Sequence, residues 1–159
     1  MLISKQGVAR IAKHEGLRLQ SYKDLAGIWT IGYGHTGTLL DGVTLVGPGQ
    51  TITTDEALAL FAKDLKWVEV ALDRFAVKAK LKQHEYDALA SLVFNTGAGV
   101  LDATRSLGLA IRTGSRPLIA QAMLLYKNAT VGGVKKPVLL GRRVEERDLF
   151  LRGYPTGVV

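Results

Sequence analysis

Apolar residues recur at three- and four-residue steps over most of the chain, which predicts a mainly helical protein. The clearest case follows Gly47-Pro48-Gly49, where the capping-box pattern Thr53-Thr54-Asp55-Glu56 precedes an apolar stripe that runs to Phe75. This spacing predicts one long helix over residues 54–80.

The start of the chain has the same periodicity. Residues 4–14 carry an apolar stripe, and Ser4 is placed to cap the N-terminus of a helix. Glu15 continues the apolar face and is followed by Gly16, which favours helix termination. A carboxyl group in this register is expected at the edge of a core, where burial favours its protonated form.

Between Tyr22 and Val46 the pattern changes to aromatic and β-branched residues separated by many glycines. Such a pattern predicts short strands and turns. Within it, the alternation from Ile28 to Tyr33 places Thr30 on the opposite side of a strand from its neighbours. We therefore expect a small hairpin sheet.

The second half of the chain predicts a bundle of shorter helices. The expected helices cover residues 83–95, 105–112, 117–126 and 140–151. Gly97 is expected to end the first of these helices, and Gly132-Gly133 marks a loop before the last one. Together with the hairpin, this pattern gives an α+β fold that is mostly α-helical.

Composition narrows the class of protein. With 159 residues, 47% of them hydrophobic, the chain is long enough to bury a core and short enough to form one domain. It has no cysteine, which excludes disulfides and thiolate metal sites, and no clustered histidines suggest a metal. The opening residues contain no long apolar run, so we expect neither a signal peptide nor an integral membrane segment.

Two carboxyl groups point to glycoside hydrolysis. That reaction needs a protonated acid for the leaving oxygen and an ionised carboxylate that positions water or attacks the sugar. Glu15 on its apolar face fits the first role, and Asp24 in a polar turn fits the second. Because the chain has 14 acidic residues, the pair gains weight only from its surroundings.

Those surroundings carry a family resemblance. The segment from Glu15 to His35, with its Gly-Leu-Arg-Leu and Trp-Thr-Ile-Gly-Tyr-Gly-His runs, closely resembles the signature of the phage-type lysozymes, or endolysins. Glu15, Asp24 and Thr30 stand at the family's spacing, nine and then six residues apart. The resemblance assigns them as the acid, the water-positioning carboxylate and its hydroxyl partner.

The resemblance also implies a lysozyme-like fold within a single domain of residues 1–159. A small sheet-containing lobe at about 15–53 is expected to join a helical lobe at 81–159 through the helix at 54–80, with the helix at 4–14 packed on the helical lobe. Phe94-Asn95-x-Gly97 and Gly141-Arg142-Arg143-x-x-Glu146-Arg147 look like the family's cleft motif and closing helix, respectively.

Further residue roles follow only from the resemblance. It implies glycan contacts at Thr36, Phe94 and Ser106. Arg142 is expected to pair with the catalytic glutamate, with Arg143 as the alternative, and His35 is expected to form a structural ion pair with Asp64. A general-base role for His35 is the less favoured alternative.

In function, the resemblance implies an enzyme that hydrolyses the β-1,4 linkage between N-acetylmuramic acid and N-acetylglucosamine in peptidoglycan, with inversion and without a cofactor. Its partners would be glycan strands, not nucleic acid. As an endolysin it would lyse the host, after accumulating in the host cytoplasm as a monomer and reaching the wall with the help of a holin.

Two alternatives remain open. A lytic transglycosylase cleaves the same bond with one glutamate, but Asp24 and Thr30 favour direct attack by water. A non-catalytic module that binds the cell wall or nucleic acid would explain the net charge of +7 and the lysines at 78, 80 and 82, and it would leave the motif unexplained.

Overall fold

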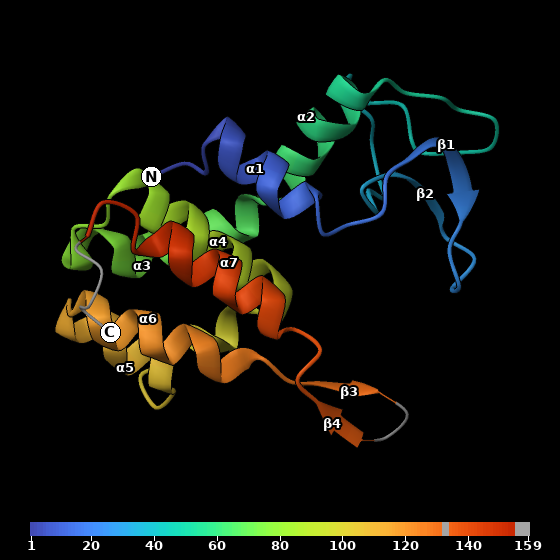
Figure 1. Cartoon of the computed structure of the whole chain (residues 1–159). Coiled ribbons are helices and arrows are strands. Elements are labelled where there is room, and N and C mark those ends of the chain that lie inside the picture. The colour runs from blue at the N-terminus through green and yellow to red at the C-terminus, as the bar shows by residue number, and fades with distance from the viewer. Residues whose placement is uncertain (132–133, 155–159) are drawn as a thin grey trace. The chain divides into compact units, whose positions relative to one another are not determined.

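A computed structural model describes the backbone of residues 1–131 and 134–154, and their side chains except at 76–78 and 131. The loop expected at Gly132-Gly133 and the side chain of Lys78 lie outside these described parts. The helices are α1 (Lys5–Ala12), α2 (Thr54–Asp64), α3 (Lys66–Ala79), α4 (Gln83–Thr96), α5 (Ser106–Thr113), α6 (Arg116–Met123) and α7 (Leu140–Phe150), with short 3₁₀ helices η1 (Ala98–Leu101) and η2 (Leu124–Tyr126). The strands are β1 (Arg18–Lys23), β2 (Trp29–Gly32), β3 (Ala129–Val131) and β4 (Val134–Lys136) (Figure 1).

The chain divides into two compact units. One unit is continuous and covers residues 8–67, which include the hairpin and α2. The other combines residues 1–7 with residues 68–159 and contains the helices from α4 to α7. The divisions fall inside α1 and near the start of α3, so each unit receives part of a helix.

In the unit of residues 8–67, β1 and β2 form the predicted antiparallel hairpin, with Tyr22 opposite Thr30 and a register shift nearer Arg18. A small core lies between this hairpin and α2. Its buried members are Ile31, Val46, Ile52, Ala57 and Leu60. Gly32 has a φ of 67° and a Cβ there would lie 3.3 Å from the Cβ of Ala57, so this contact between strand and helix favours glycine.

The predicted N-terminal caps are formed. The Gly7 N–H donates to the hydroxyl of Ser4 over 3.0 Å at the start of α1. At the start of α2, the Glu56 N–H donates to Thr53 Oγ1 over 3.2 Å while the Thr53 N–H donates to the Glu56 carboxylate over 2.7 Å. Both helix starts are therefore fixed by local sequence.

The segment predicted as one helix over residues 54–80 is divided in the structure. α2 ends at Asp64, and α3 begins at Lys66. Leu65 lies between them, and its ψ of −3° departs from the helical value. Its N–H still donates to the carbonyl oxygen of Phe61 over 3.0 Å. The apolar period continues across this residue because the interruption is so short, which is why the sequence pattern does not show it.

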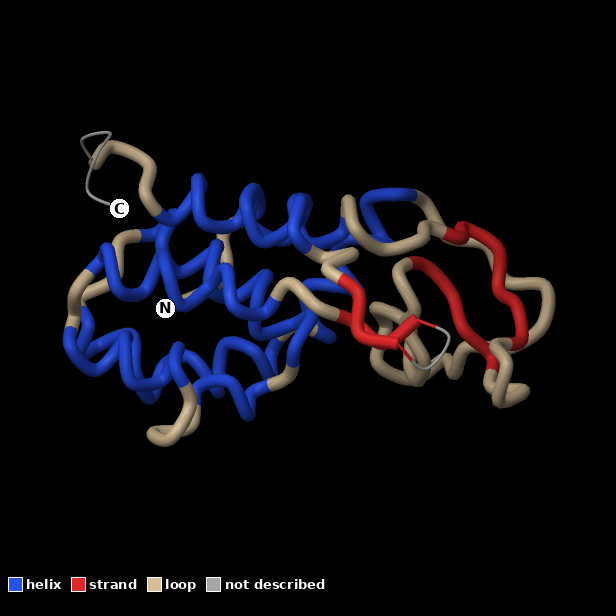
Figure 2. The backbone as a smooth tube through the Cα atoms, turned by 60° about the horizontal axis from the view of Figure 1, so that its bottom comes forward, coloured by secondary structure: helices blue, strands red, loops and turns tan. Residues whose placement is uncertain are grey.

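The other unit is organised around α4, most of whose residues are buried. α7 lies alongside α4, and α5 lies beside α6 (Figure 1). Gly97 caps α4 with a φ of 85°, as predicted. The β3–β4 hairpin, which apolar periodicity did not predict, extends away from these helices (Figure 2). Within the described residues, no helix combines the length and apolar character needed to cross a membrane.

Candidate active site

Backbone hydrogen bonds hold Glu15 just after the C-terminal end of α1. Its N–H donates to the carbonyl oxygen of Ala12 over 2.9 Å, and the His14 N–H donates to that of Ile11 over 3.0 Å. Ile11 and Ala12 are 0% and 3% exposed, so the end of the helix is anchored in the core. Glu15, which follows this buried end of the helix, is itself half-buried.

Asp24 begins the turn that joins β1 to β2. Its Oδ1 accepts hydrogen bonds from the N–H groups of Ala26 and Ile28, both over 2.9 Å. The backbone closes the same turn, because the Asp24 N–H donates to the Ile28 carbonyl over 3.0 Å and Gly27 takes a φ of 79°. Among the described residues only Oδ1 is anchored in this way, so Oδ2 remains available to another partner.

Thr30 lies on the same face of the hairpin as Asp24. The register places Thr30 opposite Tyr22, and Asp24 follows Tyr22 by two residues, so the side chains of Asp24 and Thr30 are diagonal neighbours. The Thr30 hydroxyl donates to the Ile28 carbonyl over 3.0 Å, and the residue is 3% exposed. With its proton used in this way, the hydroxyl oxygen presents lone pairs as an acceptor.

The hairpin therefore offers two oriented acceptors, a carboxylate oxygen and a hydroxyl oxygen. Both side chains are tied to the carbonyl or the N–H of Ile28, so one turn residue fixes the position of each. Two acceptors on one face can receive the two protons of a water molecule and direct its oxygen lone pairs outward. This is an arrangement suited to positioning a nucleophilic water.

His35 forms the expected pair with Asp64. Its Nδ1 lies 2.9 Å from Oδ1 and 3.0 Å from Oδ2 of Asp64, and its Nε2 lies 2.9 Å from the carbonyl oxygen of Thr38. All of these partners are acceptors, so both contacts are made together only when both ring nitrogens carry protons. The pair ties the segment after β2 to the end of α2. Both ring nitrogens are engaged by these contacts, which favours a structural role over that of a general base.

The three expected glycan contacts are divided between the two units. Thr36 is exposed and belongs to the unit that holds Glu15, Asp24 and Thr30. Phe94, half-buried near the end of α4, and Ser106, exposed at the start of α5, belong to the other unit.

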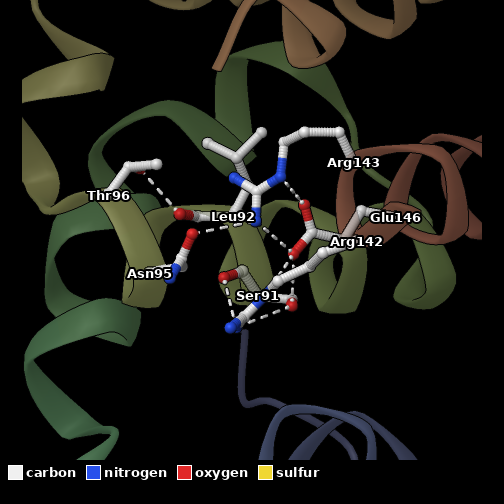
Figure 3. Close-up of polar contacts among 7 residues, drawn as sticks. All are labelled: Ser91, Leu92, Asn95, Thr96, Arg142, Arg143 and Glu146. Carbon is white, nitrogen blue, oxygen red and sulfur yellow. Dashed lines mark hydrogen bonds and ion pairs between the residues drawn. The ribbon is translucent and has the colours of Figure 1, made fainter. Parts of the chain in front are cut away.

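Arg142 and Arg143 lie in a buried polar cluster between α4 and α7 (Figure 3). The Glu146 Oε1 accepts hydrogen bonds from the Ser91 hydroxyl over 2.6 Å, from Arg142 Nε over 3.1 Å and from Arg143 Nη2 over 3.0 Å. Arg143 Nη2 also donates to Asn95 Oδ1 over 3.1 Å. Arg143 is 0% exposed, so two guanidinium groups share one carboxylate in this cluster.

Burial raises the pKa of Glu146, against the opposing attraction of Arg143 and the hydrogen bond from Ser91. The three- and four-residue spacing of the arginines and Glu146 along α7 is typical of charge pairing within one helix. It did not indicate that Ser91 and Asn95 on α4 complete the cluster. Their spacing of four residues along one helix was the only signal, and many surface helices share it.

Residues 12–146 match the family model described as phage lysozyme. The chain belongs to the phage lysozyme family. This lysozyme is 42% identical over 151 residues to the endolysin of Salmonella phage P22, covering 95% of this chain and 99% of the relative. It is 36% identical over 152 residues to an endolysin from Acyrthosiphon pisum secondary endosymbiont phage 1, covering 94% and 98% of the two chains.

Solved structures show the same fold. A crystal structure of a P22 lysozyme mutant superposes with a TM-score of 0.81 at 38% identity and covers 95% of this chain and 99% of its own. The endolysin from Escherichia coli O157:H7 phage FAHEc1 gives a TM-score of 0.74 at 33% identity, with coverage of 98% and 97%. The predicted α+β, lysozyme-like fold is therefore confirmed, and the protein is a peptidoglycan-cleaving lysozyme, an enzyme of the hydrolase class.

Proposed function

We propose that this lysozyme hydrolyses the β-1,4 bond between N-acetylmuramic acid and N-acetylglucosamine, with Glu15 as the general acid and Asp24 and Thr30 as the residues that hold the attacking water. The observation that carries the proposal is the placement of Asp24 and Thr30 on one face of the β1–β2 hairpin, each fixed through Ile28. The residue roles come from the resemblance, and the hairpin geometry supports two of them.

In the proposed reaction, the Glu15 carboxyl group gives its proton to the glycosidic oxygen as the bond from that oxygen to the anomeric carbon breaks. Asp24 Oδ2 accepts a proton from the water while the water oxygen bonds to the anomeric carbon. Water thus supplies one hydrogen and one hydroxyl group to the two products. Attack from the face opposite the leaving group gives an inverted product, an α-anomeric reducing end.

Arg142 is the proposed cationic partner of Glu15, and Arg143 is the alternative that the resemblance leaves. Arg143 is the more deeply buried of the two, with its guanidinium between Glu146 and Asn95. Arg142 keeps 10% of its side chain exposed. This difference in burial favours Arg142 for a role outside its own cluster.

The main test compares turnover of purified peptidoglycan by wild type, Glu15→Gln, Asp24→Asn and the exposed control Glu145→Gln. We expect Glu15→Gln to lower the rate by about 10²–10⁴-fold, because amides do not act as general acids. The Asp24→Asn substitution preserves the turn, since the amide oxygen can still accept hydrogen bonds from the N–H groups of Ala26 and Ile28. It removes the base, because the amide nitrogen cannot accept a proton from water. The control is expected to retain activity.

Mass spectrometry of the released fragments distinguishes the alternatives. Reducing-end fragments that depend on Glu15 and Asp24 support hydrolysis. Anhydro-sugar ends that persist in Asp24→Asn would instead identify a lytic transglycosylase, and release that is unchanged in Glu15→Gln would remove Glu15 from the mechanism.

We also propose that the enzyme acts as a monomeric endolysin, which accumulates in the host cytoplasm and reaches the wall after a holin permeabilises the membrane. The similarity to phage endolysins supports this role. The positive charge of the chain would then favour its approach to an anionic wall, in preference to a nucleic-acid partner.

A further inference from the structure

A hollow on the unit that contains residues 68–159 is lined by residues other than those assigned to catalysis. It has a volume of about 470 Å³ and is formed by α3, η1 and α5. A neighbouring hollow of about 440 Å³ shares Arg74, Phe75 and Arg112 with it. The lining combines apolar residues, two arginines and one aspartate, among them Ala71, Arg74, Phe75, Leu101, Asp102 and Arg112.

The two arginines provide the positive side of this hollow. Both are exposed, and the guanidinium carbon of Arg112 lies 5.4 Å from the centre of the Phe75 ring. Contact with an aromatic face restrains a guanidinium group without using its hydrogen-bond donors. Among the described residues neither Arg74 nor Arg112 has an ion-pair partner, so their donors are available to a carboxylate.

Asp102 provides the negative side. Its Oδ1 accepts hydrogen bonds from the N–H and the hydroxyl of Thr104, over 2.8 and 2.9 Å. These bonds, with smaller contributions from Arg112 and Arg105, hold the pKa of Asp102 below its ordinary value. The carboxylate is therefore a fixed negative charge beside the arginines, and in the described part of the chain its Oδ2 accepts no hydrogen bond.

We propose that this hollow binds a short zwitterionic peptide. Its carboxylate would bind Arg74 and Arg112, its ammonium group would bind Asp102, and its aliphatic part would pack on Phe75 and Leu101. A volume of about 470 Å³ lies within the range of small-molecule sites. Phosphate is less suitable, because Asp102 repels a ligand that carries only negative charge.

Peptidoglycan contains short peptides with these groups, so the site would give the enzyme a second attachment to its wall substrate. This assignment of the peptide to the wall rests on the proposed function. The binding chemistry of the hollow does not, because it is carried by residues outside the proposed catalytic set.

The test is calorimetric titration of the protein with the tripeptide L-alanyl-γ-D-glutamyl-meso-diaminopimelate, which needs no turnover. We expect saturable binding that Arg74→Gln/Arg112→Gln weakens by about tenfold or more, because charge-assisted hydrogen bonds to carboxylates are lost. The matched control Arg152→Gln removes an exposed arginine of the same unit outside the hollow, and binding should be unchanged. Thermal unfolding of each variant checks that it is folded.

A second variant isolates the negative side of the hollow. Asp102→Asn keeps an oxygen that can accept hydrogen bonds from Thr104 but removes the negative charge. It should therefore lower the affinity for the free tripeptide. The affinity for the N-acetylated, amine-blocked tripeptide should be unchanged. No binding of the tripeptide, equal affinity in the double arginine variant, or tighter binding of inorganic phosphate than of the tripeptide would overturn the proposal. Loss of glycan cleavage in Glu15→Gln tests the proposed function separately, since that variant should still bind the tripeptide.

Discussion

Replacing Gly108 with alanine sets two physical effects against each other. Gly108 lies inside α5, where alanine is intrinsically better than glycine by about 1 kcal/mol. A Cβ at this position would, however, lie 2.0 Å from the carbonyl oxygen of Asp102 and 2.5 Å from that of Leu101. Real Cβ contacts essentially never fall below 3.0 Å, and both obstructing atoms belong to the backbone.

The backbone cannot swing aside as a side chain can, so α5 has to move away from η1 and the residue that follows it. Such a movement loosens the packing of Leu107 and Ile111, which are 0% and 2% exposed on the same helix. Overpacking of this kind typically costs about 1–3 kcal/mol and more when backbone must shift. Because the obstructing atoms belong to the backbone, the cost is expected at the upper end of this range. After subtraction of the gain in helix propensity, we expect Gly108→Ala to lower the free energy of unfolding by about 2 kcal/mol.

Equilibrium unfolding in urea, followed by circular dichroism, measures this change. Gly141→Ala is the matched control, because Gly141 also lies in a helix and a Cβ there meets nothing within 4 Å. The control should raise the free energy of unfolding by about 0.5–1 kcal/mol from backbone entropy. If Gly108→Ala is as stable as wild type, or is stabilised to the same extent as Gly141→Ala, the contact with the two carbonyl groups does not limit this position.

Two further predictions concern the hydrogen-bonded carboxylates of Asp64 and Glu85. His35→Asn should lower the free energy of unfolding by about 1–3 kcal/mol, because hydrogen bonds to the charged Asp64 are lost. Thermal unfolding of this variant, of Asp64→Asn and of the double variant should show non-additive losses of stability. Additive losses would contradict direct coupling between the two residues. Glu85 is fully buried, which by itself raises its pKa, but hydrogen bonds from Arg116, the Lys82 N–H and Tyr154 outweigh burial and hold the pKa of Glu85 below its ordinary value. A lowered carboxyl pKa adds stability that is complete above the ordinary value and is lost as pH falls through the folded value. The free energy of unfolding, measured in urea, should therefore fall more steeply from pH 6 to pH 3 in wild type than in Glu85→Gln. Equal falls in the two proteins would show that Glu85 is not the cause.

Local sequence determined much of the fold. The caps at Ser4 and Thr53 and the stop at Gly97 depend on residues within a few positions of one another, and they appear where the sequence predicted them. The run of aromatic, β-branched and glycine residues likewise predicted the hairpin that carries Asp24 and Thr30. The register of its two strands then determines that these side chains share a face.

The tertiary structure decided the features that depend on contacts between distant segments. Gly108 looks like a defect in a helix until the carbonyl groups of Leu101 and Asp102 are seen to occupy the space of its Cβ. Ser91 and Asn95 become partners of Arg142 and Arg143 only because α4 and α7 pack together, 48 or more residues apart along the chain. Periodicity records which face of a helix is buried, but it holds no information on which atoms of another element lie against that face.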